Sequence, residues 1–272
     1  MILNGRALAK EVLARAAERA SRLPQPPKVV VIVANETPAT KSYLAIKSAR
    51  AADAGCVLVT MHFSEHEDTA TLRAAVSRAD ADALVVQLPL PPGVDLHAVC
   101  NAIPLEKDAD VLSLAARGKA ARGVPESLLP PVVAAVKEIL THGNVVTAGK
   151  RAVVIGSGFL VGEPVAAWLV REGAEVTVVD RGDDLSGALL HADLIISGAG
   201  SPHLIKPEML KEGVVLIDAG TSEASGKIVG DADLACAPVC SLFTPVPGGI
   251  GPIAVAKLFE NAVLLAERKV SF

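Results

Sequence analysis

The sequence predicts an α/β protein built from two domains, each with a parallel β-sheet. Short runs of Val, Ile and Leu alternate with longer helix-like segments along the whole 272 residues, as in strand–helix–strand units. Hydrophobic residues make up 51% of the chain and aromatic residues only 3%, which is typical of buried parallel strands rich in small aliphatic side chains. The length alone suits one large domain or two of modest size, and the two αβ blocks favour two.

The first half of the chain reads as strands that alternate with helices. "KVVVIVAN" (residues 28–35) is an unbroken β-branched run of the kind found in buried strands. The next segment opens with Thr37-Pro38 and ends near Gly55, which indicates a helix because proline is tolerated in the first turn and glycine often ends a helix. The same criteria predict strands at 56–63 and 81–93, and helices at 68–80, 95–102 and 130–143. A loop at 103–110 and a less regular stretch precede the helix at 130–143.

The second half is a more regular αβ block. Its expected elements are strands at 150–156, 174–180, 192–200 and 213–220, a helix at 161–173, a short hairpin at 225–233 and a final helix at 251–268. We therefore expect an N-terminal domain over 1–128 and a second domain over 129–251. Residues 252–272 are expected to form a helix that packs back on the N-terminal domain.

Charge and composition argue against several classes of protein. The formal net charge of -4 and the pI near 5.9 do not fit a nucleic-acid binder, which shows a basic face. No apolar run approaches the roughly 20 residues that span a bilayer, and the amphipathic N-terminus does not resemble a signal peptide. The four cysteines lack the spacing of a zinc site, so we expect free thiols in a reducing cytoplasm and no metal.

A glycine-rich turn follows the strand at 150–156. Gly156-Ser157-Gly158 is followed by Gly162 at the start of a helix, which approximates the dinucleotide fingerprint. In that fingerprint glycines let the backbone approach a pyrophosphate at a helix N-terminus. The alternative is a tight turn with a purely structural role. The strand and helix on either side favour dinucleotide binding and make this a Rossmann-type domain.

The strand after this turn ends in Asp180. Its spacing in sequence from Gly156 is close to the roughly 20 residues expected for the acid that binds the ribose hydroxyls. A carboxylate there favours NAD, because it repels the 2′-phosphate of NADP. Arg181 follows at once and could grip that phosphate instead. Asp180 thus favours NAD, and Arg181 keeps NADP open as the alternative.

"KSYLAIKSAR" (41–50) contains the only tyrosine of the chain. In a helix, Tyr43 and Lys47 lie one turn apart on the same face. The pair could simply be a ring that covers a lysine stem on a solvated surface. The remaining motifs favour a functional reading.

Several segments together resemble the bifunctional 5,10-methylenetetrahydrofolate dehydrogenase/5,10-methenyltetrahydrofolate cyclohydrolases. The most specific is "TPVPGGIGP" at 244–252, close to the family's T-P-V-P-G-G-V-G-P. "VVQLPLPPGVD" (85–95), "SYLAIK" (42–47) and "PLEKDAD" (104–110) match its Q-L-P-L-P turn, its Y-x-x-x-K helix and its P-x-K-D-V-D loop. "VLIDAG" and "GKIVGDAD" also fit. The matches keep the family's order over nearly the whole chain.

The resemblance implies roles for individual residues. Lys47 would be central to the cyclohydrolase step, oriented by Gln87, and Tyr43 would stack on the folate. Asp110 would bind the donors of the pterin, with Pro247, Gly248 and Gly249 close to the flat substrate. Gly220 and Thr221 would place backbone groups near the nicotinamide or its ribose. The alternatives are a turn-capping amide for Gln87, a solvated loop acid for Asp110 and an ordinary loop for "PVPGGIGP".

The chemistry favours the same residue types. Hydride transfer from the methylene carbon needs alignment more than a strong base. Hydrolysis of the methenyl product needs a group that activates water, and a lysine with a lowered pKa can do so. The expected function is NAD(P)-dependent oxidation of 5,10-methylenetetrahydrofolate, then hydrolysis to 10-formyltetrahydrofolate, which serves one-carbon metabolism and purine biosynthesis. By resemblance we also expect a homodimer, formed through the nucleotide domain.

The chain departs from the family pattern at several points. The nucleotide turn lacks the family's usual arginine, and the next strand ends in Asp180-Arg181 instead of C-H-S. Val111-Leu112 replaces Gly-Phe, residues 130–135 have lost the P-C-T-P-x-G pattern, and Ile253-Ala254 replaces M-T. Three rival functions follow: a monofunctional NAD-dependent dehydrogenase, a folate- or nucleotide-binding regulator without turnover, and a different Rossmann dehydrogenase. The last leaves the two proline-rich motifs unexplained.

Overall fold

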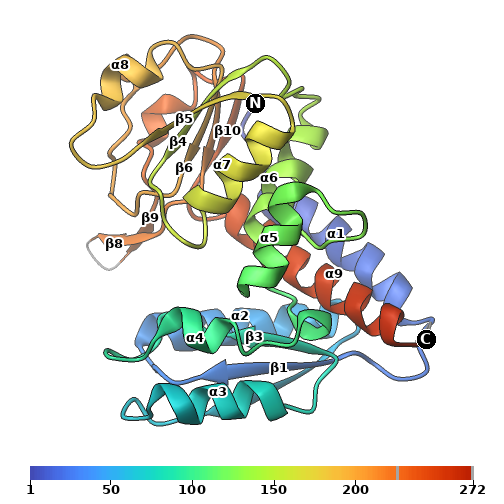
Figure 1. Cartoon of the computed structure of the whole chain (residues 1–272). Coiled ribbons are helices and arrows are strands. Elements are labelled where there is room, and N and C mark those ends of the chain that lie inside the picture. The colour runs from blue at the N-terminus through green and yellow to red at the C-terminus, as the bar shows by residue number, and fades with distance from the viewer. Residues whose placement is uncertain (225–226, 271–272) are drawn as a thin grey trace. The chain divides into compact units, whose positions relative to one another are not determined.

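The computed structural model describes residues 1–224 and 227–270, and at residues 38, 39, 42, 43 and 224 it describes the backbone only. These residues form two compact units. The five-stranded unit comprises residues 1–9 and 132–254. The three-stranded unit comprises residues 10–131 and the described residues from Val255 onward. Each unit has its own parallel sheet, which confirms the predicted α/β class (Figure 1).

The three-stranded unit has a parallel sheet in the order β2-β1-β3. Its strands are β1 (Lys28–Val33), β2 (Val57–His62) and β3 (Ala83–Val86). Its helices are α2 (Pro38–Asp53), α3 (Thr69–Arg78), α4 (Leu96–Cys100) and α5 (Leu114–Arg122), with the short 3₁₀ helix η1 at Leu105–Lys107. β1 lies in the centre of the sheet with its last five residues buried, as the unbroken aliphatic run predicts.

Local signals explain where α2 begins. The hydroxyl of Thr37 accepts a hydrogen bond from the amide of Thr40 at 3.1 Å, and Pro38 occupies the first turn. The helix continues to Asp53, so Lys47 lies in the third turn of a well-capped helix.

Helix α5 contradicts the expectation that the stretch before residue 130 is irregular. Ser113 caps its start, and Gly123, with a φ of 64°, ends it.

The five-stranded unit has a parallel sheet in the order β10-β7-β6-β4-β5. Its strands are β4 (Arg151–Ile155), β5 (Glu175–Val179), β6 (Leu194–Ser197), β7 (Val215–Asp218) and β10 (Leu242–Thr244), and β8 (Ser222–Ala224) pairs antiparallel with β9 (Lys227–Val229). Its helical elements are α6 (Pro131–His142), α7 (Gly162–Arg171), α8 (Leu185–Leu189), η2 (Pro207–Met209) and η3 (Leu234–Cys236). A buried aliphatic cluster contributed by β4, β6 and β7 fills the core.

Strand order determines where a ligand can bind to this sheet. β4 comes first in the chain, β5 lies on one side of it and β6 on the other, so the order reverses at β4. In open parallel sheets, the crevice at such a reversal, beyond the carboxyl ends of the strands, is the usual ligand site. The turns after β4 and β6 border this crevice.

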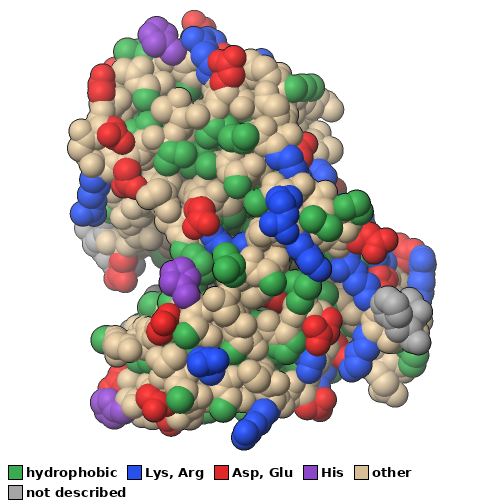
Figure 2. Space-filling view, viewed as in Figure 1, with side chains coloured by type: hydrophobic (Ala, Val, Ile, Leu, Met, Phe, Trp, Pro, Cys, Tyr) green, Lys and Arg blue, Asp and Glu red, His purple; other side chains and the backbone are tan. Residues whose placement is uncertain are grey.

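Helices α1 (Gly5–Ala20) and α9 (Ile250–Val270) belong to both units. Each runs across a boundary between the units along the chain. Within the three-stranded unit, Arg19 of α1 pairs with Glu267 of α9. Acidic and basic side chains are interspersed on the face seen in Figure 2. Among the described helices, none is long and apolar enough to cross a membrane.

Candidate active site

Lys47 and Gln87 form a buried polar pair in the three-stranded unit. Lys47 projects from α2, and Gln87 directly follows β3. The Lys47 Nζ donates to the Gln87 Oε1 at 2.8 Å, and the Gln87 Nε2 donates to the carbonyl of Leu88 at 2.8 Å. The second bond fixes the direction of the amide, so its oxygen faces the ammonium group. Gln87 therefore caps the turn and orients the lysine at the same time.

Burial changes the protonation chemistry of Lys47. Only 9% of the side chain is exposed, which rules out the alternative of a lysine on a solvated helix face. Loss of solvent lowers the pKa of Lys47, and the charge of Asp110 opposes this shift. Gln87 is a neutral partner and cannot compensate the charge as a carboxylate would. A larger fraction of Lys47 is thus in the neutral, proton-accepting form than for a solvated lysine.

Asp110 lies in a tightly organised loop after η1. The neighbouring Asp108 is buried and accepts the amides of Leu112 at 3.0 Å and Ser113 at 2.8 Å, so it serves the turn itself. Asp110 is partly buried, and desolvation raises its pKa while Lys47 lowers it. Of the two acids in "KDAD", the second is the one whose carboxylate is not used by the turn.

Two further residues shape this loop and were not identified from the sequence. Asn261 of α9 is buried, and its Nδ2 donates to the carbonyls of Ala109 at 2.9 Å and Leu129 at 3.0 Å. Val111 has a φ of 56°, a conformation that a β-branched residue rarely adopts. Asn261 lies about 150 positions along the chain from the loop, so no local pattern could reveal its role. The side chain of Tyr43, the fourth expected member of this site, lies outside the described residues.

The predicted nucleotide turn has the shape of a phosphate cradle. Gly156 has a φ of 88°, and a Cβ added at Gly162 would lie 1.8 Å from the carbonyl oxygen of Gly156. Both positions therefore require glycine. A Cβ added at Gly158, in contrast, would meet none of the described atoms within 4 Å. The turn is closed on the protein side and open at Gly158, which fits a dinucleotide whose pyrophosphate approaches the backbone.

The turn is joined to the end of β5 by a charged hydrogen bond. The Ser157 hydroxyl donates to the Asp180 carboxylate at 2.5 Å, and the amide of Arg181 donates to the other oxygen at 2.9 Å. The bond from Ser157 is the main reason that the pKa of Asp180 is lowered. Asp180 is therefore held as an anion beside the glycine turn.

A pair of buried aspartates, not identified from the sequence, organises the other turns at this edge of the sheet. Asp231 accepts the Ser197 hydroxyl at 2.6 Å and the amides of Ala199 and Ser201 at 2.8 and 2.7 Å, which fixes the turn after β6. Asp218 accepts the amides of Gly220 at 2.9 Å and Ala232 at 2.8 Å. Burial raises the pKa of Asp218 to about 6.

Glycine is required where these carboxylates pack. A Cβ added at Gly220 would lie 2.1 Å from the Asp231 carboxyl carbon, so the backbone passes directly over the acid. Thr221, the next residue, is exposed. Gly220 and Thr221 follow the carboxyl end of β7. Because β4 and β7 are parallel strands of the same sheet, these residues lie at the same edge as the turn after β4.

The "TPVPGG" segment follows β10 at this edge. The peptide bond before Pro247 is cis, Gly248 has a φ of 102°, and Gly249 is buried against the carbonyl of Pro245. Thr244 anchors the segment, because its hydroxyl accepts the amide of Asp218 at 2.8 Å. The segment is therefore tied to the backbone of the buried Asp218.

Comparisons with known proteins agree over almost the whole length. The model for the tetrahydrofolate dehydrogenase/cyclohydrolase catalytic domain matches residues 3–110, and the model for the NAD(P)-binding domain of the same family matches residues 130–270. The bifunctional protein FolD 2 of Lactobacillus johnsonii is 35% identical over 277 residues, which covers 98% of both chains.

Solved structures show the same relationship. The bifunctional methylenetetrahydrofolate dehydrogenase/cyclohydrolase from Campylobacter jejuni aligns with a TM-score of 0.94 and 32% identity, covering 99% of both chains. The enzyme from Trypanosoma brucei, in complex with NADP and an inhibitor, has a TM-score of 0.94 and 31% identity, covering 100% of this chain and 99% of its own. The chain belongs to the tetrahydrofolate dehydrogenase/cyclohydrolase family.

Proposed function

We propose that this enzyme oxidises 5,10-methylenetetrahydrofolate with a nicotinamide dinucleotide and then hydrolyses the methenyl product to 10-formyltetrahydrofolate, with Lys47 responsible for the second step. The observation that carries the proposal is the buried Lys47, whose Nζ donates to the neutral Oε1 of Gln87 at 2.8 Å. A lysine used only for solubility would be solvated, and a structural one would be paired with a carboxylate.

In the first step the protein aligns its reactants. The dinucleotide, when bound, supplies the hydride acceptor, and the cation that forms is stabilised by the two nitrogens of the substrate itself. Asp110 would accept donors from the pterin, because a carboxylate can take two parallel hydrogen bonds from an amino-pyrimidinone edge. Tyr43 would stack on the substrate, and Pro247 to Gly249 would let a flat molecule lie against the backbone.

In the second step Lys47 would accept a proton from water as the water adds to the methenyl carbon. Burial already lowers the pKa of Lys47, and a cationic substrate nearby would lower it further. Gln87 would hold the amine in one orientation through the oxygen that faces it. A positioned base of this kind typically contributes 10²- to 10⁴-fold in rate.

We further propose that the preferred dinucleotide is NAD. Asp180 is held as an anion by Ser157, beside the turn formed by Gly156, Gly158 and Gly162. A fixed carboxylate there suits the free 2′-hydroxyl of NAD and repels the 2′-phosphate of NADP. Arg181 carries the opposite preference, so exchanging it for alanine should leave NAD usage intact.

Assembly and location complete the proposal. β5 is an edge strand of its sheet, and Val178 on β5 and Val170 on α7 are 45% and 61% exposed. These exposed apolar side chains support a homodimer formed through the nucleotide-binding unit. The four buried cysteines are free thiols, which supports a reducing compartment such as the cytoplasm.

An anaerobic assay with 5,10-methylenetetrahydrofolate, run with NAD and NADP in parallel, tests the proposal. Reduced nicotinamide and 10-formyl product would be measured separately. Both should form, faster with NAD. Accumulation of the methenyl product would leave a monofunctional dehydrogenase, and binding without turnover would leave a regulator. Sedimentation velocity would test the dimer.

A further inference from the structure

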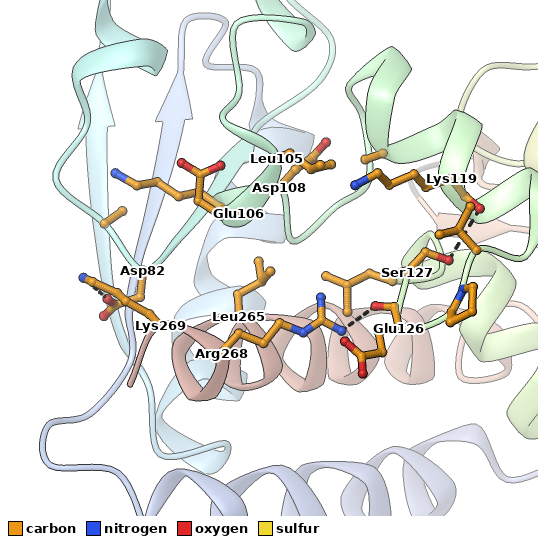
Figure 3. Close-up of a pocket in the computed structure, with 16 residues that line it drawn as sticks. Asp82, Leu105, Glu106, Asp108, Lys119, Glu126, Ser127, Leu265, Arg268 and Lys269 are labelled. Carbon is orange, nitrogen blue, oxygen red and sulfur yellow. Dashed lines mark hydrogen bonds and ion pairs between the residues drawn. The ribbon is translucent and has the colours of Figure 1, made fainter. Parts of the chain in front are cut away.

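A cavity in the three-stranded unit is lined by neither Lys47 nor Gln87, although Asp108 of the loop before Asp110 forms part of its wall. Its volume is about 660 Å³, within the range of small-molecule sites. It opens between the start of β3, η1, helix α5, the loop at 124–128 and the last turns of α9 (Figure 3). Residues of five elements thus enclose it.

The interior of the cavity is mainly apolar. Leu105, Leu128 and Leu265 line it together with Val124 and Pro125. Leu265 is buried beneath the opening, while Leu105 is 37% exposed on the wall. Such a surface favours the flat or branched hydrocarbon part of a ligand.

Two cationic side chains reach into this apolar space. Figure 3 shows the ammonium of Lys119, from α5, and the guanidinium of Arg268, from α9, directed into the cavity. Among the described residues, neither forms an ion pair with a carboxylate. Arg268 donates instead to the neutral carbonyl of Glu126 at 2.5 Å. A guanidinium with five donors keeps most of them available for a second partner.

Four of the six other charged side chains on the wall are engaged elsewhere. Lys269 pairs with Asp82 at 2.7 Å, and Lys107 donates to the carbonyl of Ala79 at 3.0 Å. Asp108 accepts two backbone amides from the turn that follows it. Glu106 and Glu126 also line the cavity, and both are exposed, so solvent screens their charges at its edge.

We propose that this cavity binds a small organic anion, with its carboxylate, phosphate or sulfonate between Lys119 and Arg268 and its apolar part against Leu105, Leu128 and Leu265. Charge complementarity selects an anion, because two cations without carboxylate partners face the same apolar space. The volume and the apolar lining select an organic molecule over a free inorganic ion.

The site is separate from the Lys47 site. Ala81 and Asp82, which line the cavity, precede β3, and Gln87 follows it. At about 3.3 Å per residue, Ala81 and Asp82 are roughly 17–20 Å from Gln87 along the strand. The wall formed by η1 nevertheless continues through Asp108 to Asp110, so an occupant would touch the segment that carries the substrate-binding acid.

Calorimetric titration of the full-length enzyme with naphthoate, and with its uncharged amide naphthamide, tests the proposal. The two compounds share a shape, so their difference in affinity isolates the charge. Naphthoate should bind to one site at least tenfold more tightly than naphthamide, as expected for charge-assisted hydrogen bonds. Binding should persist in saturating tetrahydrofolate and NAD.

Lys119→Ala and Arg268→Ala should each abolish this tenfold preference. Arg122→Ala is the matched control, because Arg122 is on the same helix as Lys119 but does not line the cavity. If Arg268→Ala loses stability with its bond to Glu126, Lys119→Ala decides the matter. Equal affinity for the two compounds, displacement by tetrahydrofolate, or an unchanged preference in Lys119→Ala would overturn the proposal.

Discussion

Replacing Gly158 with alanine tests the nucleotide turn without disturbing the fold. The new Cβ would meet no described atom within 4 Å, and Gly158 does not have a positive φ, so alanine fits the folded backbone. Alanine also restricts the unfolded chain, so the free energy of unfolding should stay level or rise by about 0.4–1 kcal/mol. Dinucleotide binding should nevertheless weaken, because the methyl group occupies the space through which a pyrophosphate approaches the backbone.

The expected loss is at least tenfold in affinity for NAD, which corresponds to about 1.4 kcal/mol. Calorimetric titration with NAD and thermal unfolding would be measured on the same preparations. Gly118→Ala is the matched control: Gly118 is on α5, and its nearest neighbour would be the flexible end of Arg122 at 3.4 Å. A Gly158→Ala enzyme that binds NAD as tightly as the wild type would refute the assignment of this turn.

Three further perturbations probe the surrounding framework. Gly162→Ala should destabilise the enzyme by about 3 kcal/mol or more in denaturant unfolding, because its Cβ would lie 1.8 Å from a backbone oxygen; wild-type stability would show that α7 can shift freely. Asn261→Ala should cost about 1–3 kcal/mol and raise the KM for the folate but not for NAD, since it frees the carbonyl beside Asp110; equal effects on both KM values would argue against local positioning. Asp218 has a folded-state pKa of about 6 against 3.8 unfolded, so it contributes stability that is present below about pH 4 and lost as pH rises through about 6. Relative to Asp218→Asn, the wild type should therefore lose up to about 3 kcal/mol between pH 4 and pH 7 in urea titrations, and a difference that is independent of pH would contradict this.

Much of the fold follows from local patterns in the sequence. The strands that become β1, β4, β6 and β7 are unbroken aliphatic runs, and each is found where it was predicted. α5 was missed because only Ala116 and Ala120 of its nine residues are buried, which leaves no apolar periodicity to detect. Its capping residues, Ser113 and Gly123, were the available signal. β10 is only three residues long, too short for a pattern.

The residues of the candidate site also fall into those that local patterns reveal and those that only the fold brings together. Lys47, Gln87 and the glycines of the nucleotide turn could be identified because each lies in a motif with a local spacing. Asp231 and Asn261 could not, because their partners lie 30 or more positions away and are set by sheet order and helix packing. Ser157 and Asp180 were both noted from the sequence, but their hydrogen bond depends on β4 and β5 being neighbours.

The most direct test of the central claim compares the wild type with Lys47→Gln in the anaerobic assay. Glutamine keeps a polar side chain of similar length but cannot accept a proton from water. The account predicts that 10-formyl product falls at least 100-fold while reduced nicotinamide still forms and methenyltetrahydrofolate accumulates. If Lys47→Gln forms the 10-formyl product at the wild-type rate, Lys47 is not the base and the proposed second step is wrong.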